Sequence, residues 1–496
     1  MKSFPRIASS ALLSIALIVF VPLLQAQLDH SPLSGGVLAA RAFRAGRLHI
    51  KPGSGIQAPG RALTCSPAPC IFPDTDASEG GSLPVNEDPV ASNPNNSQQI
   101  LTGGNDYNCP AIQGFFASDD AGATWKRNCL PLLPGGFGEG DPIVGYDLNN
   151  VAYAGGIQGA GNFLGIVVSS STNNGTTWGA PMQAVPAELG YLADKPWMEV
   201  DDNASSPFAN NIYISTTQFA SNSDSQIWVA HSTDGGNTWS DVAVSTKQHF
   251  PTAVDQFSDL AVGADGTVYL NWLRCPANGP SGDCAGTQST LMFSKSTDGG
   301  ITWSSEVAAA TTTLVTDPDF CCFYGELPNT FERVSNIPAN GVFGSGSSAT
   351  VYITFYNWTG SQMQVEVAKS TDGGSTWGAP VRVTSSNSGD QFFPWINLSQ
   401  NGKLAVTWLD RRNDPQNVSY QPFIATSQSA GVTFSLSHAL TSTLSNPFND
   451  GFGGAFMGDY RTHVWNGANV YAVWMDTRSG TSQDQAGGAT FANFVQ

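Results

Sequence analysis

One short loop recurs along the chain, and this repeat restricts the possible folds more than any other feature. Its best copies read STDGGNTW at 232–239, STDGGITW at 296–303 and STDGGSTW at 370–377. Looser copies stand at 118–125 and 171–178, and a worn copy, SQSAGVTF, stands at 427–434. A period of about sixty residues predicts a propeller or a solenoid made of one repeated unit.

The letters of the loop describe a tight turn between two strands. Asp in such a turn accepts hydrogen bonds from backbone N–H groups ahead of it, and Gly supplies a positive φ. Thr then restarts a strand, and Trp packs against neighbouring strands. One active site does not need five good copies of a loop, so we expect the repeated loops to be structural hairpin connectors.

The rest of the repeat also reads as short strands. Each unit opens with one strand and continues with another before the loop. The first strands are expected at 87–92, 141–146, 194–200, 258–263, 331–336, 392–398 and 459–465. Four short antiparallel strands per unit predict an all-β protein, a β-propeller of four-stranded antiparallel blades. Seven blades are favoured and six are the alternative; a sandwich of two sheets would leave the period unexplained. No long stretch has a helical period, so we expect almost no helix.

The last unit lacks a fourth strand. We expect the N-terminal region around 60–72 to supply it and close the ring. The expected divisions are a signal peptide at 1–26, an N-terminal extension at 27–84, part of which closes the ring, and the propeller at 85–496. Basic residues precede a short apolar run and a plausible cleavage site ends at Ala26, which is the layout of a secretory signal. A membrane anchor is the weaker interpretation, because the run is short for a bilayer span.

Charge and cysteine content narrow the possible partners. The formal net charge of −18 disfavours nucleic acid and anionic membranes, so we expect neither nucleic-acid binding nor membrane insertion. We expect a secreted monomer, extracellular or periplasmic.

Eight cysteines in an exported chain predict disulfides. The expected pairs are Cys65–Cys70, Cys109–Cys129 and Cys275–Cys284. Adjacent Cys321 and Cys322 could bridge each other or seek other partners. A zinc site is the competing interpretation, but the sequence shows neither clustered His nor a paired CxxC motif. We expect no cofactor, with structural calcium left open.

The Ser-x-Asp-x-Gly-x-Thr-Trp pattern resembles the Asp-box (BNR) repeat of the sialidase superfamily. The resemblance covers most of the chain after the signal peptide. It implies a six-bladed ring, three arginines that grip a substrate carboxylate, a Tyr–Glu nucleophile pair and an Asp acid/base. The family's first arginine should lie on the first innermost strand. That strand reads EDPVAS here and has no arginine, and the only PRIA lies at 5–8, inside the expected signal peptide. Asp boxes also occur in propellers that are not sialidases.

Candidate site residues gather where the innermost strands begin. We call this end of the propeller the loop-rich rim, because the long connections between second and third strands also lie there. The repeated loops lie at the opposite end, which we call the turn rim. Tyr460, Asp459 and Glu332 are the candidate catalytic residues: a nucleophile and carboxylates with separated pKa values. The candidate anion clamp is Arg333, Arg412, Arg461 and Arg478, because Arg binds carboxylates in a bidentate manner. Asp410 and Asp476 stand two residues before Arg412 and Arg478, so these pairs could instead be structural ion pairs.

These residues predict an exported, sialidase-like glycoside hydrolase that acts on an acidic glycan. The alternative is a non-catalytic exported propeller that binds a polysaccharide or a protein partner. Whether the chain is an enzyme at all stays open from the sequence, as do the sugar and its linkage.

Overall fold

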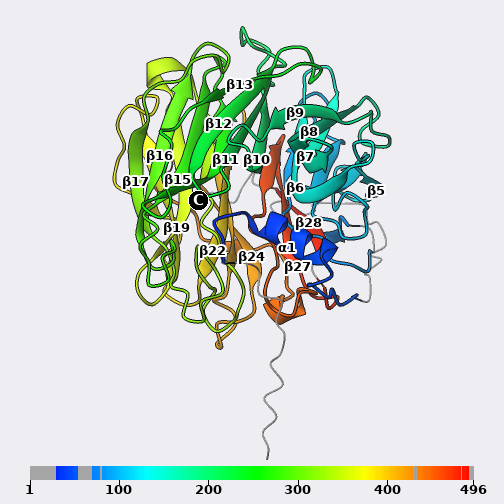
Figure 1. The fold of residues 1–496 in the computed structure, drawn as a ribbon. Helices are drawn as coiled ribbons and strands as arrows, with labels where there is room; N and C mark the ends of the chain where they lie inside the picture. The colour runs from blue at the N-terminus through cyan, green and yellow to red at the C-terminus, as the bar shows by residue number, and fades with distance from the viewer. Residues whose placement is uncertain are drawn as a thin grey trace, which may run out of the picture.

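The computed structural model describes residues 30–53, 70–78, 81–427, 431, 433–481 and, for the backbone, 483–490. The expected signal peptide, Cys65 and part of the worn loop at 427–434 lie outside these ranges. The described strands form seven four-stranded antiparallel sheets around one axis, which confirms the all-β propeller (Figure 1).

Six of the sheets are each built from four consecutive strands. The first two contain β2 (Val90–Ser92), β3 (Ile100–Gly104), β4 (Gly114–Ser118) and β5 (Lys126–Cys129), and then β6 (Phe137–Tyr146), β7 (Ala152–Ala160), β8 (Phe163–Ser171) and β9 (Met182–Pro186). The next two contain β10 (Leu192–Val200), β11 (Ile212–Phe219), β12 (Ser225–Ser232) and β13 (Ser240–Ala243), and then β14 (Val254–Val262), β15 (Val268–Cys275), β16 (Gln288–Ser296) and β17 (Val307–Thr313). The last two contain β18 (Ala339–Phe343), β19 (Thr350–Trp358), β20 (Met363–Ser370) and β21 (Val381–Arg382), and then β22 (Gln391–Leu398), β23 (Leu404–Asp410), β24 (Gln421–Ser427) and β25 (His438–Ala439).

The seventh sheet joins the two ends of the chain. It contains β26 (His463–Asn466), β27 (Asn469–Asp476) and β28 (Gln483–Thr490), and β1 (Thr75–Asp76) adds the outermost strand. Thr75 pairs with Ala486 and Asp76 with Gln485. An N-terminal strand therefore closes the ring, at 75–76 rather than around 60–72, most of which lies outside the described residues.

The repeated loops connect the third and fourth strands of their sheets, as the sequence predicts. In the copy between β16 and β17, Asp298 accepts hydrogen bonds from the Thr302 N–H at 2.9 Å and the Thr302 hydroxyl at 2.5 Å. The Ser296 hydroxyl donates to Asp298 and accepts from the Gly300 N–H at 2.9 Å. These bonds hold the pKa of Asp298 below its usual value, with the Thr302 hydroxyl as the largest cause. The loop is a self-contained turn, and its carboxylate is already fully engaged.

Several innermost strands begin with a bulge that carries chemically useful side chains. Asp141 and Lys195 each precede a proline and have φ of 54° and 45°. The strand register shifts between Asp194 and Trp197 and again between Gly140 and Ile143. Positive φ is uncommon for residues with a side chain, and a proline lacks the N–H that a regular ladder needs. The bulges therefore set local geometry at the loop-rich rim.

The helix α1 (Gly35–Arg44) departs from the expectation of almost no helix. The Ser34 hydroxyl accepts a hydrogen bond from the Val37 N–H and caps its first turn, and Arg41 and Arg44 lie in its last turn. Both are ordinary start and stop signals, in a segment assigned only to an extension. In Figure 1, α1 lies near the centre of the viewed face, in front of β27 and β28.

The innermost strand of the fifth consecutive sheet also lies elsewhere than predicted. It is β18, at Ala339–Phe343, and not the segment 331–336. Glu332 and Arg333 therefore belong to the long connection before the strand, where Arg333 forms an isolated bridge with Glu326. Pro338 directly precedes β18, and a proline suits the residue before a ladder begins.

Three disulfides are described. Cys109–Cys129 and Cys275–Cys284 confirm the local pairing, and Cys321 is bonded to its neighbour Cys322. Disulfides are typical of exported proteins. Within the described part of the chain, no helix is both long and apolar enough to span a bilayer.

Asp298 tests whether the repeated loops are structural. Asp298→Ala should lower the free energy of unfolding by about 0.5–2 kcal/mol, because the turn loses its acceptor. Asp298→Asn should cost less, since Asn173 already holds an equivalent loop by accepting from Thr177 N–H and donating to the Thr177 hydroxyl. Urea denaturation measures both. Equal losses for the two variants, or no loss with Ala, would contradict the structural role.

Candidate functional site

Four carboxylates are buried where innermost strands begin at the loop-rich rim. We call Glu87, Asp141, Asp194 and Asp459 the axial cluster; none of them is exposed. They come from segments that are far apart in sequence: Asp141 and Asp194 lie in β6 and β10, and Glu87 and Asp459 lie shortly before β2 and β26. Glu87 links two members, because one of its oxygens accepts from the Asp459 N–H at 3.1 Å. Its other oxygen accepts from Asn105 at 2.7 Å.

Burial changes the titration of this cluster. It raises the pKa of Glu87 to about 8, with the Asp459 charge as the second cause. Burial also raises the pKa of Asp141 well above its usual value, and the neighbouring Glu87 charge adds to the effect. Lys195 lies among these groups, and burial lowers the pKa of its amine. Its ammonium stands 4.3 Å from the ring centre of Tyr460. Glu87 is therefore largely protonated at neutral pH.

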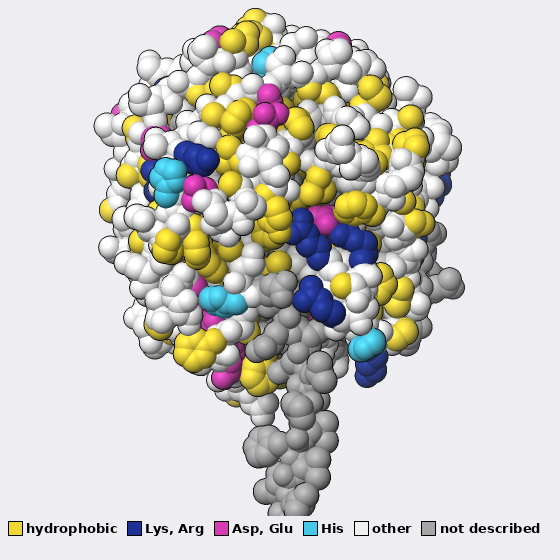
Figure 2. Space-filling view, in the orientation of Figure 1, with side chains coloured by type: hydrophobic (Ala, Val, Ile, Leu, Met, Phe, Trp, Pro, Cys, Tyr) yellow, Lys and Arg dark blue, Asp and Glu magenta, His cyan; other side chains and the backbone are white. Residues whose placement is uncertain are grey.

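The chain's own N-terminal segment covers the axial cluster. The Ser34 N–H donates to Asp194 at 2.8 Å, and the Gly35 N–H donates to Asp459 at 2.7 Å. The helix α1 thus directs its N-terminus, the positive end of its dipole, at two buried carboxylates. Further along, the guanidinium groups of Arg41 and Arg44 both pair with Glu139. Figure 2 shows Lys and Arg side chains gathered near the middle of this face, in the region of α1.

Arg333 binds one of these carboxylates and the N-terminal segment at the same time. It donates to the two oxygens of Asp459 at 2.8 and 3.1 Å and to the Leu33 carbonyl at 3.0 Å. Both partners of the ion pair are at most 2% exposed. Arg333 therefore serves as a bridge between a buried carboxylate and the N-terminal segment.

Tyr460 and Glu332 are also enclosed. The Tyr460 hydroxyl donates to the Pro142 carbonyl at 3.1 Å, and burial raises its pKa well above the usual value. A tyrosine nucleophile needs the opposite shift. Glu332 accepts from the Met457 N–H at 3.1 Å, and burial, followed by the Asp450 charge, raises its pKa well above the usual value. Their contacts are structural, and their catalytic roles stay predictions.

The remaining arginines do not converge on one opening. Arg412 pairs with Asp410 at 2.5 Å, and Arg478 pairs with Asp476 at 2.6 Å and Asp74 at 2.8 Å. Arg461 is fully buried, and its guanidinium has no hydrogen-bond partner among the described residues. Burial lowers its pKa to about 9. Both copies of the Asp-x-Arg repeat therefore form an ion pair within their own blade. The anion-clamp role of these arginines stays a prediction.

The open site lies at the other end of the axis, on the turn rim. A cavity of about 950 Å³ is formed there by the ends of the innermost strands and the turns that follow them. Trp197 and Trp395 line it, and their rings contact each other with centres 4.5 Å apart. We call this space the axial cavity.

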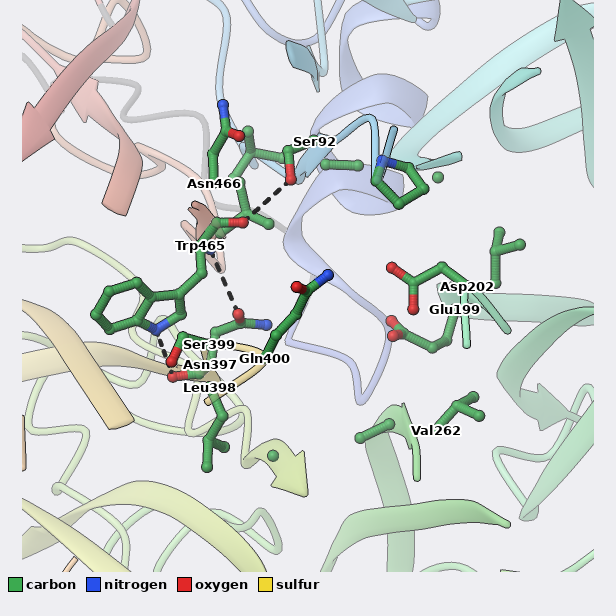
Figure 3. A pocket seen from close by; sticks show the side chains of 18 of the residues that line it. Ser92, Glu199, Asp202, Val262, Asn397, Leu398, Ser399, Gln400, Trp465 and Asn466 are labelled. Atoms are coloured by element: carbon green, nitrogen blue, oxygen red, sulfur yellow. Dashed lines mark hydrogen bonds between the residues drawn. The ribbon is translucent and has the colours of Figure 1, made fainter. Parts of the chain in front are cut away.

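The walls of the axial cavity carry polar groups that point inward. Figure 3 shows Glu199 and Asp202 directed into the cavity from one wall, with Gln400 facing them from another. Trp465 holds a third part of the wall, where its indole N–H donates to the Asn397 carbonyl at 3.1 Å and its own carbonyl accepts from Ser92 at 3.1 Å. These two bonds join three different blades.

Both carboxylates on the wall have a raised pKa. Burial raises the pKa of Glu199 well above its usual value, helped by the Asp202 charge. The pKa of Asp202 rises to about 6, through burial and then the Asp201 charge. Asp202 is solvent-exposed, so water inside the cavity screens part of this effect. Sequence reasoning missed both residues; the signal was the acidic run EVDD at 199–202, directly after an apolar strand.

One group of side chains has donors for a metal ion. Ligand atoms of His30, Asp283 and Asp317 lie within 4.8 Å of one another. They already pair with each other, because His30 Nε2 stands 3.1 Å from Asp283 and 3.7 Å from Asp317. Hydrogen bonds to these two carboxylates raise the pKa of His30 to about 9. The contribution of this His30 pairing to the stability of the fold is complete below the usual histidine pKa. It is lost as the pH rises through about 9.

Comparisons with known proteins add distant likenesses only. No protein-family model matches the chain, and no curated protein matches its sequence. Among solved structures, an α-L-arabinofuranosidase from Fusarium graminearum is 12% identical, with 72% of this chain and 94% of that chain covered and a TM-score of 0.44. An α-L-arabinanase from Penicillium chrysogenum is 12% identical, with 73% and 96% covered and a TM-score of 0.43. An intramolecular trans-sialidase from Ruminococcus gnavus is 11% identical, with 72% and 94% covered and a TM-score of 0.44. Likenesses of this size carry no argument about the activity of this chain.

The Arg333–Asp459 pair should be essential for stability. Asp459→Asn leaves a buried guanidinium without its counter-charge, and it should lower the free energy of unfolding by about 3–5 kcal/mol. The double variant Arg333→Met/Asp459→Asn should lose less, because neither charge remains buried. Asp119→Asn is the control, since it breaks an exposed pair with Lys126 that contributes about 0–1 kcal/mol. Chemical denaturation measures all three, and an Asp459→Asn loss as small as the control's would refute the bridge.

Proposed function

We propose that this chain is an exported carbohydrate-binding propeller that holds a neutral glycan in the axial cavity. The observation that carries the proposal is the open, polar cavity at the turn rim, combined with a loop-rich rim that the N-terminal segment fills. Of the two functions that the sequence allows, non-catalytic binding of a polysaccharide therefore has the better support. Its resemblance to Asp-box proteins of the sialidase superfamily fits either function.

The chemistry of the cavity wall favours sugar hydroxyl groups. Carboxylates accept hydrogen bonds, and amides such as that of Gln400 both donate and accept. A hydroxyl group can use both kinds of partner. The volume of about 950 Å³ lies within the usual range for ligand pockets. Several sugar units fit better than one, because residues of seven innermost strands surround a space of this size.

The charge of the cavity argues for a neutral ligand. Asp202 is exposed on the wall, and its pKa of about 6 leaves it charged at neutral pH. The body of the protein carries a formal net charge of −18. A sialic acid or a uronic acid would meet repulsion there. An acidic glycan would instead need the arginines at the loop-rich rim, where Arg333 is already paired with Asp459.

A second candidate, hydrolysis of an acidic glycan, rests on the axial cluster. Buried carboxylates with separated pKa values are the groups that glycoside hydrolases use. In this structure Ser34 and Gly35 occupy the space next to Asp194 and Asp459. Hydrolysis at that place would require the N-terminal segment to leave.

Calorimetric titration tests the binding proposal. Neutral oligosaccharides of several units should bind the full chain, whereas sialylated ones should not. Asp202→Asn should weaken binding about tenfold or more, since hydrogen bonds to charged groups contribute about 1.5–3 kcal/mol. Glu199→Ala should also weaken binding, because the wall loses a carboxyl group that can bond a sugar hydroxyl. Glu188→Gln is the matched control, because Glu188 is a carboxylate outside the cavity.

Two outcomes would decide against binding at the axial cavity. One is tight binding of sialylated glycans that Arg461→Lys weakens and Asp202→Asn does not. The other is release of the fluorophore from sialic acid substrates by the full chain, which would restore the hydrolase prediction.

A further inference from the structure

The N-terminal segment meets the propeller as a ligand meets a receptor, through its main chain. Pro32 and Leu33 offer carbonyl groups, and Ser34 and Gly35 offer N–H groups. The Pro32 carbonyl accepts from the Tyr324 hydroxyl at 2.8 Å and from Gln256 at 3.1 Å. The Leu33 carbonyl accepts from Arg333 at 3.0 Å. Such main-chain capture is how extended peptides are recognised at protein surfaces.

The propeller side of this contact consists of five charged and polar side chains. Some of them accept hydrogen bonds from the segment and the others donate to it. Asp194 and Asp459 accept the two N–H groups, and Gln256 also donates to Asp194 at 2.8 Å. Tyr324, Gln256 and Arg333 donate to the two carbonyls. All five side chains are buried, and they come from four different connections or strands. They form a preorganised groove for a peptide backbone.

Glycine is required where the segment passes closest to the axial cluster. A Cβ on Gly36 would stand 2.2 Å from Asp141 Oδ1 and 2.6 Å from Glu87 Oε2. A Cβ on Gly35 would stand 2.2 Å from the ring of Phe456. The groove therefore selects the sequence Ser-Gly-Gly as well as the backbone.

Charge and connectivity set this segment apart from the propeller. Residues 31–53 contain four basic and no acidic residues, on a chain whose net charge is −18. The segment adds no strand to any described sheet. After the helix, its backbone donates two hydrogen bonds to the backbone of the propeller, from the Lys51 N–H to the Gly451 carbonyl and from the Gly53 N–H to the Ser82 carbonyl. Residues 54–69, which are not described, connect it to Cys70 and β1.

We propose that the mouth of the loop-rich rim is a peptide-binding site, which residues 31–48 occupy in the free protein. The peptide it takes is basic, contains Ser-Gly-Gly, and forms a short amphipathic helix after the two glycines. A second copy of this chain offers that peptide, so the segment can be exchanged between molecules. This site is separate from the axial cavity and stands or falls independently of glycan binding.

The test uses the complete protein, cut once. A recognition sequence for a specific protease replaces residues 55–60, which precede Cys65 and Cys70, and the purified protein is cleaved there. A fluorescent peptide of residues 27–53 is then added, and its binding is followed by anisotropy. We expect the peptide to exchange with the cleaved segment while the propeller keeps its cooperative melting transition.

Two variant peptides make the result specific. Gly36→Ala should bind about tenfold or more weakly because the site is overpacked, although Ala is the better helix former. Ala45→Ser changes an exposed residue just after the opposite, C-terminal end of the helix and should bind like the parent peptide. Equal binding of the Gly36→Ala peptide would overturn the proposed site. Loss of the melting transition when the segment leaves, or no exchange under native conditions, would show that the segment is a fixed part of the core and would overturn it as well.

Discussion

Buried carboxylates on the axis must be neutralised, and this need shapes the whole loop-rich rim. Strand β10 and the connection before β26 bring Asp194 and Asp459 to the same end of the axis, where neither residue is exposed. An unpaired charge there would cost several kcal/mol, so each carboxylate needs donors. The start of α1 and the guanidinium of Arg333 supply them. The place where a propeller enzyme of the predicted kind would bind substrate is consequently filled by the chain itself.

The opposite end of the axis has the opposite character. At the turn rim the innermost strands end in short turns, and no segment of the described chain fills the space between them. Glu199 and Asp202 remain directed at an open cavity (Figure 3). The propeller thus has two different ends along one axis: a closed one, where the N-terminal segment is held through its main chain, and an open one, where we propose that sugar hydroxyl groups bind.

Local patterns explain what the sequence could predict. The loop around Asp298 closes on itself within seven residues, and Cys275 and Cys284 lie close along the chain, so both follow from spacing. The Asp410–Arg412 pair is also local. Contacts between distant segments could not be predicted: Arg333 meets Asp459 across 126 residues, and Gly35 meets it across 424. The clamp and catalytic predictions depended on such contacts, whereas α1 was missed despite its local capping signals.

The location of a bound glycan decides which end of the axis is the binding site. Hydrogen–deuterium exchange is measured on the full chain with and without a neutral oligosaccharide at saturating concentration. Binding in the axial cavity should slow exchange at 197–203 and 395–401, which line that cavity, and leave exchange at 32–37 and 456–461 unchanged. Slower exchange at 456–461 together with faster exchange at 32–37 would contradict it, because the glycan would then have displaced the N-terminal segment from the loop-rich rim.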